Sequence, residues 1–153
     1  YAYPLCSPSR SSFQSGRLAV HVNVENFVEP TVFNPLDRVG GYAGIPLNMT
    51  GIAQKMQQGG YRTHMTGKWD CGMATERHTP RGRGYDSFYG YFHHTNDYWT
   101  ERVNFSANRR VDICGNKFVD LWDNDRPAFR DNSTAYEEEL FENVTMKVIK
   151  EHN

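Results

Sequence analysis

The stretch that decides the fold runs from Tyr1 to Arg17 and reads YAYPLCSPSRSSFQSGR. Its apolar and aromatic beginning, Tyr1–Leu5, predicts a short buried strand. Pro8 suits the first turn of a helix, because its missing N–H needs no partner there. Ser7 is predicted to be the N-cap of that helix, and Gly16 is predicted to end it. Cys6 is therefore expected where a strand leads into the N-terminus of a helix.

The beginning of such a helix is a favourable place for an anion. Unpaired N–H groups and the positive end of the helix dipole gather there. Arg10 would project from the first turns as a planar donor for a tetrahedral oxyanion. The sequence thus predicts an anion-binding corner that contains Cys6 and Arg10. A buried thiol beside a helix cap is the other interpretation of Cys6.

The pattern Cys-x-Pro-Ser-Arg at 6–10, followed by Gly-Arg at 16–17, resembles the signature of the sulfatase family. In that family the cysteine is oxidised after translation to formylglycine, and the hydrated aldehyde attacks sulfur. The resemblance implies an α/β fold of the alkaline-phosphatase-like type, with a mainly parallel sheet flanked by helices. It also implies that Cys6 is modified by a formylglycine-generating enzyme and that Arg10 holds the modified side chain.

The bulk properties of the chain exclude some classes of protein. The chain has 153 residues, about the size of one domain. Since sulfatases are several times longer, residues 1–153 are expected to be part of a single catalytic domain, truncated at both ends. The net charge of −1, from 17 basic and 18 acidic residues, is not that of a nucleic-acid binder. No apolar run is long enough to span a bilayer, so neither a nucleic-acid partner nor a membrane span is expected.

Asparagine and cysteine residues bear on the cellular compartment. Two of the three cysteines, Cys71 and Cys114, could pair in an oxidising compartment, although spacing alone does not establish a disulfide. Four Asn-x-Ser/Thr sequons favour the secretory pathway and a lysosomal or extracellular location. The predicted glycosylation sites are Asn48, Asn104, Asn132 and Asn143.

The next part of the chain predicts an α/β unit. Leu18–Asn26 suggests a short strand or extended segment, and the Pro- and Gly-rich range Glu29–Asn48 predicts a long surface connection. A helix capped by Thr50 is then expected to end at Gly59, with a strand following at 61–66. Helix, glycines and strand in this order indicate a parallel sheet. The apolar face of that helix is predicted to contain Ile52, Ala53 and Met56.

Residues 60–69, GYRTHMTGKW, resemble the second sulfatase signature, in which the lysine binds sulfate. Because ligands bind beyond the carboxyl ends of strands in open α/β sheets, Cys6 and Lys68 are expected to share one pocket. A structural lysine at a strand end is the alternative. The family usually has histidine two residues after this lysine, where this chain has Asp70. Asp70 is predicted to accept a proton or orient a water, or else to be a turn residue that leaves activity weakened.

Residues 79–91, TPRGRGYDSFYGY, resemble the sulfatase segment in which a proline loop leads to an aromatic strand, and these aromatics are expected in the core. The adjacent His93 and His94 would point opposite ways in a strand, so one metal is not expected to bind both. His94 and Thr95 are predicted to face the substrate. Residues 97–99 and 104–131 look most like the arylsulfatase B-like branch, whose animal members act on N-acetylgalactosamine 4-sulfate.

Two more elements are expected towards the end of the chain. Residues 120–123 predict a short strand and turn, and residues 134–137 fit a capping box that opens a helix. The predicted apolar stripe of that helix consists of Tyr136, Leu140, Phe141, Val144 and Val148.

The resemblance implies a sulfuric ester hydrolase that cleaves sulfate esters of sulfated glycans or aryl sulfates. The implied catalytic residues are Cys6, Arg10, Lys68 and Asp70. A calcium ion is implied as well, with modified Cys6 as one ligand and the others outside this chain, so the chain by itself is expected to be inactive. A phosphonate or phosphate ester hydrolase of the same superfamily and a non-catalytic sulfated-glycan binder are the alternatives.

Overall fold

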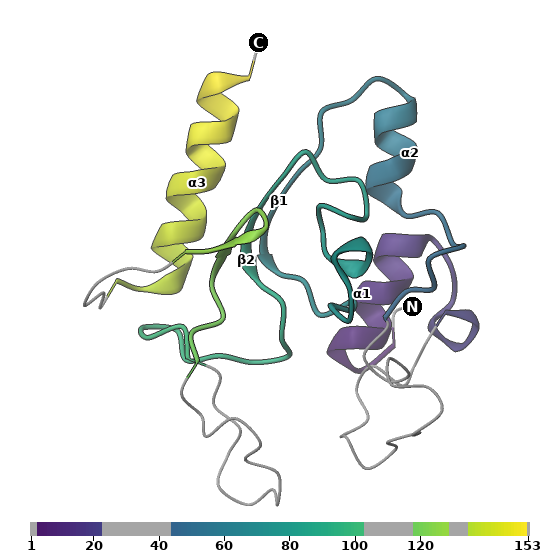
Figure 1. The fold of residues 1–153 in the computed structure, drawn as a ribbon, viewed down its shortest axis with the longest axis horizontal. Coiled ribbons are helices and arrows are strands. Elements are labelled where there is room, and N and C mark those ends of the chain that lie inside the picture. Colours follow the sequence, from purple (N-terminus) through teal and green to yellow (C-terminus); the bar gives the residue numbers. More distant parts are fainter. Residues whose placement is uncertain (1–2, 23–43, 103–117, 129–134, 153) are drawn as a thin grey trace, which may run out of the picture.

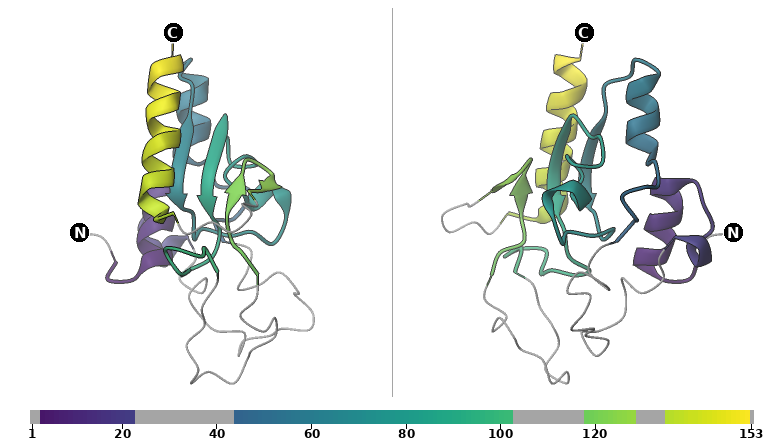
Figure 2. Two further views of the ribbon diagram at one scale, coloured as in Figure 1. Left: turned by 90° about the vertical axis from the view of Figure 1, so that its left-hand side faces the viewer. Right: turned by 45° about the vertical axis from the view of Figure 1, so that its right-hand side comes forward.

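The structure is a computed structural model, and it describes residues 3–22, 44–102, 118–128 and 135–152. Figure 1 shows a central sheet with α3 on one side and α1 and α2 on the other, and the views of Figure 2 agree. The predicted α/β class with helices flanking a sheet is therefore confirmed. In chain order the elements are α1 (Cys6–Ser15), the 3-10 helix η1 (Ala19–His21), α2 (Ile52–Gln58), β1 (His64–Lys68), the 3-10 helix η4 (Glu76–His78), β2 (Ser87–Tyr91), β3 (Trp122–Asp123), β4 (Arg126–Pro127) and α3 (Glu137–Glu151).

The sheet has the strand order β1-β2-β3-β4. β1 and β2 are parallel, as the sequence predicts, and Lys68 pairs with Tyr91 at their carboxyl ends. The pairs β2–β3 and β3–β4 are antiparallel, so the sheet is mixed over the described residues. Hydrogen bonding continues past β1, because Asp70 N–H donates to the carbonyl of Phe92 at 3.2 Å. This register holds the residues after Lys68 against the residues after β2.

The core lies on both faces of β2, whose side chains alternate between them. Phe88 belongs to the cluster that contains Trp69, while Tyr91 packs with Phe141 of α3 on the opposite face. The predicted core position of the aromatics in this strand is thus confirmed. The stripe predicted for α3 is confirmed in part: Phe141 is buried, three residues are half-buried and Tyr136 is exposed. The half-buried residues are Leu140, Val144 and Val148.

The beginning of α1 differs from the prediction. Tyr3–Leu5 is exposed and forms no strand, and residues 1–2 lie outside the described part. The helix begins at Cys6 with Leu5 in the N-cap position. Ser7 lies inside the helix and is not its cap, because its hydroxyl is bonded to a carboxylate of another segment. Gly16 does end the helix, in the left-handed conformation that glycine favours, with φ of 65°.

The α2–β1 unit is confirmed with shifted boundaries. α2 has Gly51 rather than Thr50 as its N-cap, and the Gln54 side chain accepts the Gly51 N–H at 2.8 Å. Gly59 ends the helix as predicted. Of the predicted apolar face only Ala53 is buried; Ile52 and Met56 are exposed.

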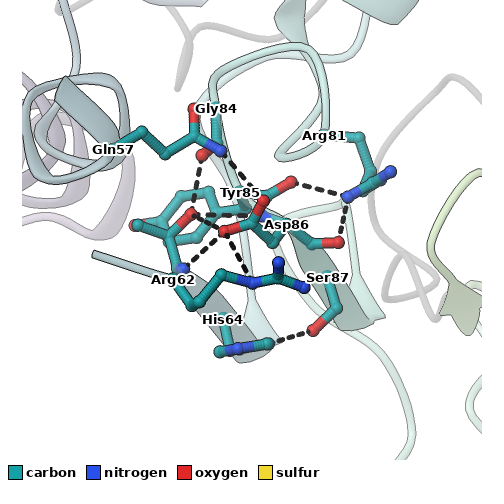
Figure 3. Close-up of polar contacts among 9 residues, drawn as sticks. Gln57, Arg62, His64, Arg81, Gly84, Tyr85, Asp86 and Ser87 are labelled. Atoms are coloured by element: carbon teal, nitrogen blue, oxygen red, sulfur yellow. Dashed lines mark hydrogen bonds and ion pairs between the residues drawn. The ribbon is translucent and has the colours of Figure 1, made fainter. Parts of the chain in front are cut away.

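β1 begins at His64, three residues later than predicted, because Asp86 holds the preceding residue. The Asp86 carboxylate accepts the Thr63 N–H at 2.7 Å and the Gln57 side-chain N–H at 3.1 Å. Figure 3 shows this cluster, with Arg62 forming an ion pair to the same carboxylate. The hydrogen bond from the Thr63 backbone holds the pKa of Asp86 below its ordinary value. A side chain thus replaces the sheet partner at Thr63.

The short strand and turn predicted at 120–123 are confirmed in part, because β3 contains only Trp122–Asp123 and the turn follows it. The extended segment predicted at Leu18–Asn26 is wrong over its described part, because Ala19–His21 is a 3-10 helix. α3 begins at Glu137 after Tyr136, and the predicted cap Thr134 lies outside the described residues.

The predicted surface connection lies mostly in 23–43, outside the described residues. Asn104, Asn132 and Cys114 lie outside them as well, while Asn48 and Asn143 are exposed. Cys71 is buried, and its pairing with Cys114 stays a prediction. No helix in the described ranges has the length and apolar character that crossing a membrane would require.

Candidate active site

Three segments far apart in the sequence meet at one corner of the sheet. Cys6 opens α1, Asp70 follows β1, and His94 follows β2. The Cys6 Sγ, a carboxylate oxygen of Asp70 and a ring nitrogen of His94 all lie within 4.8 Å of one another. Cys6 is exposed and Asp70 is buried, so the thiol is accessible while the carboxylate behind it is covered.

Asp70 is the centre of this corner. Its side chain is 8% exposed, and its backbone has φ of 50°, a left-handed conformation that few residues other than glycine adopt. Oδ1 accepts the Ser7 hydroxyl at 2.8 Å. Oδ2 lies 3.2 Å from both Lys68 Nζ and His94 Nδ1. Because an ionised carboxylate can only accept hydrogen bonds, all three partners are donors to it.

Lys68 and Arg10 supply the positive charge of the site. The Lys68 side chain is 12% exposed, and its Nζ donates to the His94 carbonyl at 2.5 Å in addition to its ion pair with Asp70. An ammonium has three N–H donors, and these two partners use two of them. Arg10 donates to the Lys68 carbonyl at 2.6 Å, which ties α1 to the end of β1. Cys6 and Lys68 thus both lie near Asp70, and the single pocket predicted for them stays a prediction.

The two adjacent histidines point to different carboxylates, as the sequence predicts. His93 Nδ1 lies 2.9 Å from Asp120 Oδ2, whereas His94 Nδ1 lies 3.2 Å from Asp70 Oδ2. Asp120 also accepts the Phe92 and His93 backbone N–H groups and the Trp122 indole N–H. Burial raises the pKa of Asp120, but the hydrogen bonds and charge of His93 outweigh it and hold that pKa below its ordinary value. His93 is therefore part of a structural network, and His94 alone faces the corner with Cys6.

A buried acid fixes the segment that carries His94. Glu137, the first residue of α3, is 1% exposed, and its carboxylate accepts the Asn96 side-chain N–H. Its own N–H donates to the Tyr98 carbonyl at 2.8 Å. Burial raises the pKa of Glu137 to about 7. Sequence reasoning missed Glu137 and the role of Ser7, because no local pattern links residues so far apart. Thr95 is exposed, and its predicted substrate contact stays a prediction.

The described residues around Cys6 do not by themselves fit a calcium ion. Calcium takes six to eight oxygen ligands. In the described ranges Cys6 is grouped with one carboxylate, that of Asp70, whose oxygens already accept from Ser7, Lys68 and His94. The predicted metal role of modified Cys6 therefore stays a prediction that needs ligands from elsewhere.

The fold of this chain occurs in solved structures. The crystal structure of Ps i-CgsB has a TM-score of 0.66 at 22% identity, and covers 98% of this chain and 33% of its own. Ps i-CgsB in complex with k-i-k-neocarrahexaose has a TM-score of 0.68 at 20% identity, and the match covers 97% of this chain and 31% of that one. At these identities the likeness concerns the fold, an α/β sheet with flanking helices.

The sequence comparisons define the family. The family model described as Sulfatase matches residues 1–152, so the chain belongs to the sulfatase family. Mouse Arylsulfatase J is 30% identical over 154 residues, which cover 100% of this chain and 23% of that protein. Rat Arylsulfatase G is 41% identical over 86 residues, which cover 56% of this chain and 14% of that protein. Human Arylsulfatase D is 36% identical over 102 residues, which cover 63% of this chain and 17% of that protein. The chain thus spans less than a quarter of the length of these relatives.

Proposed function

We propose that the full-length protein hydrolyses sulfate esters, with formylglycine made from Cys6 as its nucleophile. The observation that supports this best is the position of Cys6. It is an accessible thiol at the beginning of α1, beside a corner that Lys68 and Arg10 make positive. Sulfatase family membership over residues 1–152 supports the reaction class. The relatives named as arylsulfatases make an aryl sulfate the suitable first substrate.

The modified side chain would supply a hydrated aldehyde, in which one hydroxyl can attack sulfur and the second can later expel sulfate. The residues of this chain would prepare the site for that chemistry. The remaining Lys68 N–H would bind a sulfate oxygen and offset the charge that develops on it. Arg10 would hold the modified side chain from the first turns of α1. Asp70 brings a negative charge next to the sulfate, and its ion pair with Lys68 at 3.2 Å offsets that charge.

The experiment examines the full-length protein, made together with a formylglycine-generating enzyme. Peptide mass spectrometry should find formylglycine at Cys6, and the protein should turn over 4-nitrophenyl sulfate. Cys6→Ala should abolish turnover, whereas Cys71→Ala should leave the modification of Cys6 intact, since Cys71 is buried in the core. Unmodified thiol at Cys6 in an active preparation would contradict the proposal.

A phosphonate or phosphate ester hydrolase is the first alternative, and turnover of 4-nitrophenyl phosphate in preference to the sulfate would favour it. A non-catalytic sulfated-glycan binder is the second. The buried Asp70 favours it, because a carboxylate stands where the family usually has a histidine that can exchange a proton. Binding of a sulfated oligosaccharide without any turnover would identify that function.

The setting we propose is the secretory pathway, in lysosomes or outside the cell, with sulfated carbohydrates or aryl sulfates as substrates. The sequons at Asn48 and Asn143 support it, because both asparagines are exposed and accessible to a glycan. Calcium is proposed on family membership, with oxygen ligands from other parts of the full-length protein. The compartment is tested by mass spectrometry of the peptides that contain these two asparagines, before and after treatment with a glycosidase.

A further inference from the structure

We propose that His94, oriented by Asp70, is the group that accepts a proton from the Cys6-derived side chain when sulfate is released. The inference rests on the proposed function and assigns the proton-transfer step within it. His94 is then a catalytic residue, whereas Asp70 is a positioning residue that acts through it.

Geometry brings His94 to the reacting side chain. A ring nitrogen of His94 lies within 4.8 Å of Cys6 Sγ, the atom that the modification replaces by an aldehyde oxygen. His94 Nδ1 lies 3.2 Å from Asp70 Oδ2, so Nδ1 carries the proton of that hydrogen bond. The tautomer fixed in this way leaves Nε2 as the basic nitrogen, as a carboxylate partner does for catalytic and metal-binding histidines.

Asp70 is poorly suited to take the proton itself. Its two oxygens accept from Ser7, Lys68 and His94, and the side chain is buried. A proton on this carboxylate would remove the partner of the Lys68 ammonium, which is itself largely buried. An unpaired buried charge is strongly destabilising in proteins, more so than a pair of opposite charges. Proton transfer to His94 leaves that ion pair intact.

The imidazole is also held from its backbone. Lys68 Nζ donates to the His94 carbonyl at 2.5 Å, so the residue that pairs with Asp70 also fixes the peptide that carries the ring. Two residues further on, the Asn96 side chain is bonded to Glu137 at the beginning of α3. Such supporting contacts are what acid–base catalysis needs, since a proton acceptor works only within hydrogen-bond reach.

After the alcohol has left, the carbon derived from Cys6 carries one hydroxyl and one oxygen bound to the sulfur. The O–H bond of the hydroxyl breaks and its proton goes to His94, while its electrons form the C=O bond. The C–O bond to the sulfate breaks, and its electron pair leaves on sulfate. Water then adds to the aldehyde, and His94 returns its proton to the solvent.

The test uses the full-length modified enzyme with 4-nitrophenyl sulfate. His94→Ala should release about one equivalent of 4-nitrophenol rapidly and then turn over ~10²–10⁴-fold more slowly than the wild type. Mass spectrometry of the quenched enzyme should find sulfate bound to the Cys6 peptide. His64→Ala is the matched control, because His64 is exposed and hydrogen-bonded to Ser87 at the opposite end of β1 (Figure 3). The control should behave like the wild type.

His94→Gln guards against a folding effect, because an amide can donate to Asp70 but cannot take up a proton. It should accumulate the same sulfated peptide, and added imidazole should raise the turnover of His94→Ala. Asp70→Asn alone should lower the turnover at least tenfold. In the His94→Ala background the same substitution should lower the turnover little further. Normal turnover in His94→Ala or His94→Gln would overturn the proposal, as would slow turnover without sulfated peptide. An inactive wild type would instead contradict the proposed function.

Discussion

The Ser7 hydroxyl lies 2.8 Å from Asp70 Oδ1, and this hydrogen bond joins the beginning of α1 to the end of β1 across 63 residues of sequence. Ser7 is fully buried, so no water replaces it at the carboxylate. The bond keeps Asp70 in the left-handed conformation that turns its other oxygen towards Lys68 and His94. The position of Cys6 relative to Asp70 therefore depends on Ser7 as well as on the hydrogen bond from Arg10 to the Lys68 carbonyl.

Ser7→Ala is expected to destabilise the full-length protein by about 1.5–3 kcal/mol, the range for a hydrogen bond to a charged group. Chemical denaturation measures this difference. Ser15→Ala is the matched control, because the Ser15 hydroxyl makes only local hydrogen bonds, donating to the Ser11 carbonyl and accepting the Arg17 N–H. It should change stability little. Equal stability of Ser7→Ala and the wild type would show that Asp70 finds another donor.

Lys68→Ala is expected to lower kcat/KM for an aryl sulfate by an amount equivalent to about 2–4 kcal/mol. The variant loses a charged contact to the sulfate and leaves Asp70 buried without its counter-ion. Steady-state kinetics measure the loss. Lys55→Ala, which removes an exposed lysine of α2, should retain normal kinetics. If both variants have wild-type kinetics, Lys68 is a structural residue.

The sequence predicts the elements of this corner better than their contacts. Lys68 is correctly placed at a strand end, because the glycines before it and the tryptophan after it mark that boundary. The start of β1 is wrong by three residues because Asp86, a residue of a later segment, bonds Thr63. Local patterns cannot include such a partner. The same limit explains the wrong N-cap prediction for Ser7. Serine is a residue type that favours N-caps, but the Ser7 hydroxyl bonds a carboxylate 63 positions away.

The role of Asp70 was equally beyond the sequence. The resemblance marks Asp70 as a departure from a histidine, and His94, whose Nδ1 lies 3.2 Å from the Asp70 carboxylate, comes from the segment after another strand. Only the parallel pairing of β1 with β2 brings these two residues to the same edge of the sheet. The sequence also predicts that His93 and His94 diverge, but from the alternation of a strand; both residues lie in a bend after β2, where they contact different carboxylates.

Gly90→Ala is expected to disrupt the pairing that positions Lys68. A Cβ at Gly90 would lie 2.0 Å from the carbonyl oxygen of Gly67, the residue before Lys68, and backbone must move to make room. Overpacking of this kind costs about 1–3 kcal/mol or more. Both the melting temperature and the turnover of an aryl sulfate should fall. Gly51→Ala is the control, because its Cβ would meet its nearest atom at an ordinary 3.5 Å.

The buried acid at the beginning of α3 makes stability depend on pH. Burial raises the pKa of Glu137 from 4.5 to about 7, and the nearby Glu138, Glu101 and Asp120 add to this effect, while the Asn96 hydrogen bond opposes it. Between these two pKa values the folded protein binds more protons than the unfolded chain. Its free energy of unfolding therefore falls as the pH rises from about 4.5 to about 7.

Glu137→Gln should remove most of this dependence. The gap between the two pKa values corresponds to roughly 3 kcal/mol at most, so the variant should be more stable than the wild type at neutral pH by about 1–3 kcal/mol. At acidic pH the two should be similar, because protonated glutamate and glutamine are alike. The glutamine can also donate an N–H to Asn96 Oδ1, which is buried and has no hydrogen-bond partner within the described ranges.

Thermal unfolding of the full-length protein at pH 5 and pH 7 is the measurement, with the exposed Glu142→Gln as the matched charge control. The wild type and the control should both melt lower at pH 7, while Glu137→Gln should lose most of that difference. A wild type whose stability rises over this interval, or a Glu137→Gln variant with an unchanged pH dependence, would mean that Glu137 stays ionised in the folded protein. The Asn96 contact would then be an ordinary charged hydrogen bond, and α3 would hold the His94 segment equally well at both pH values.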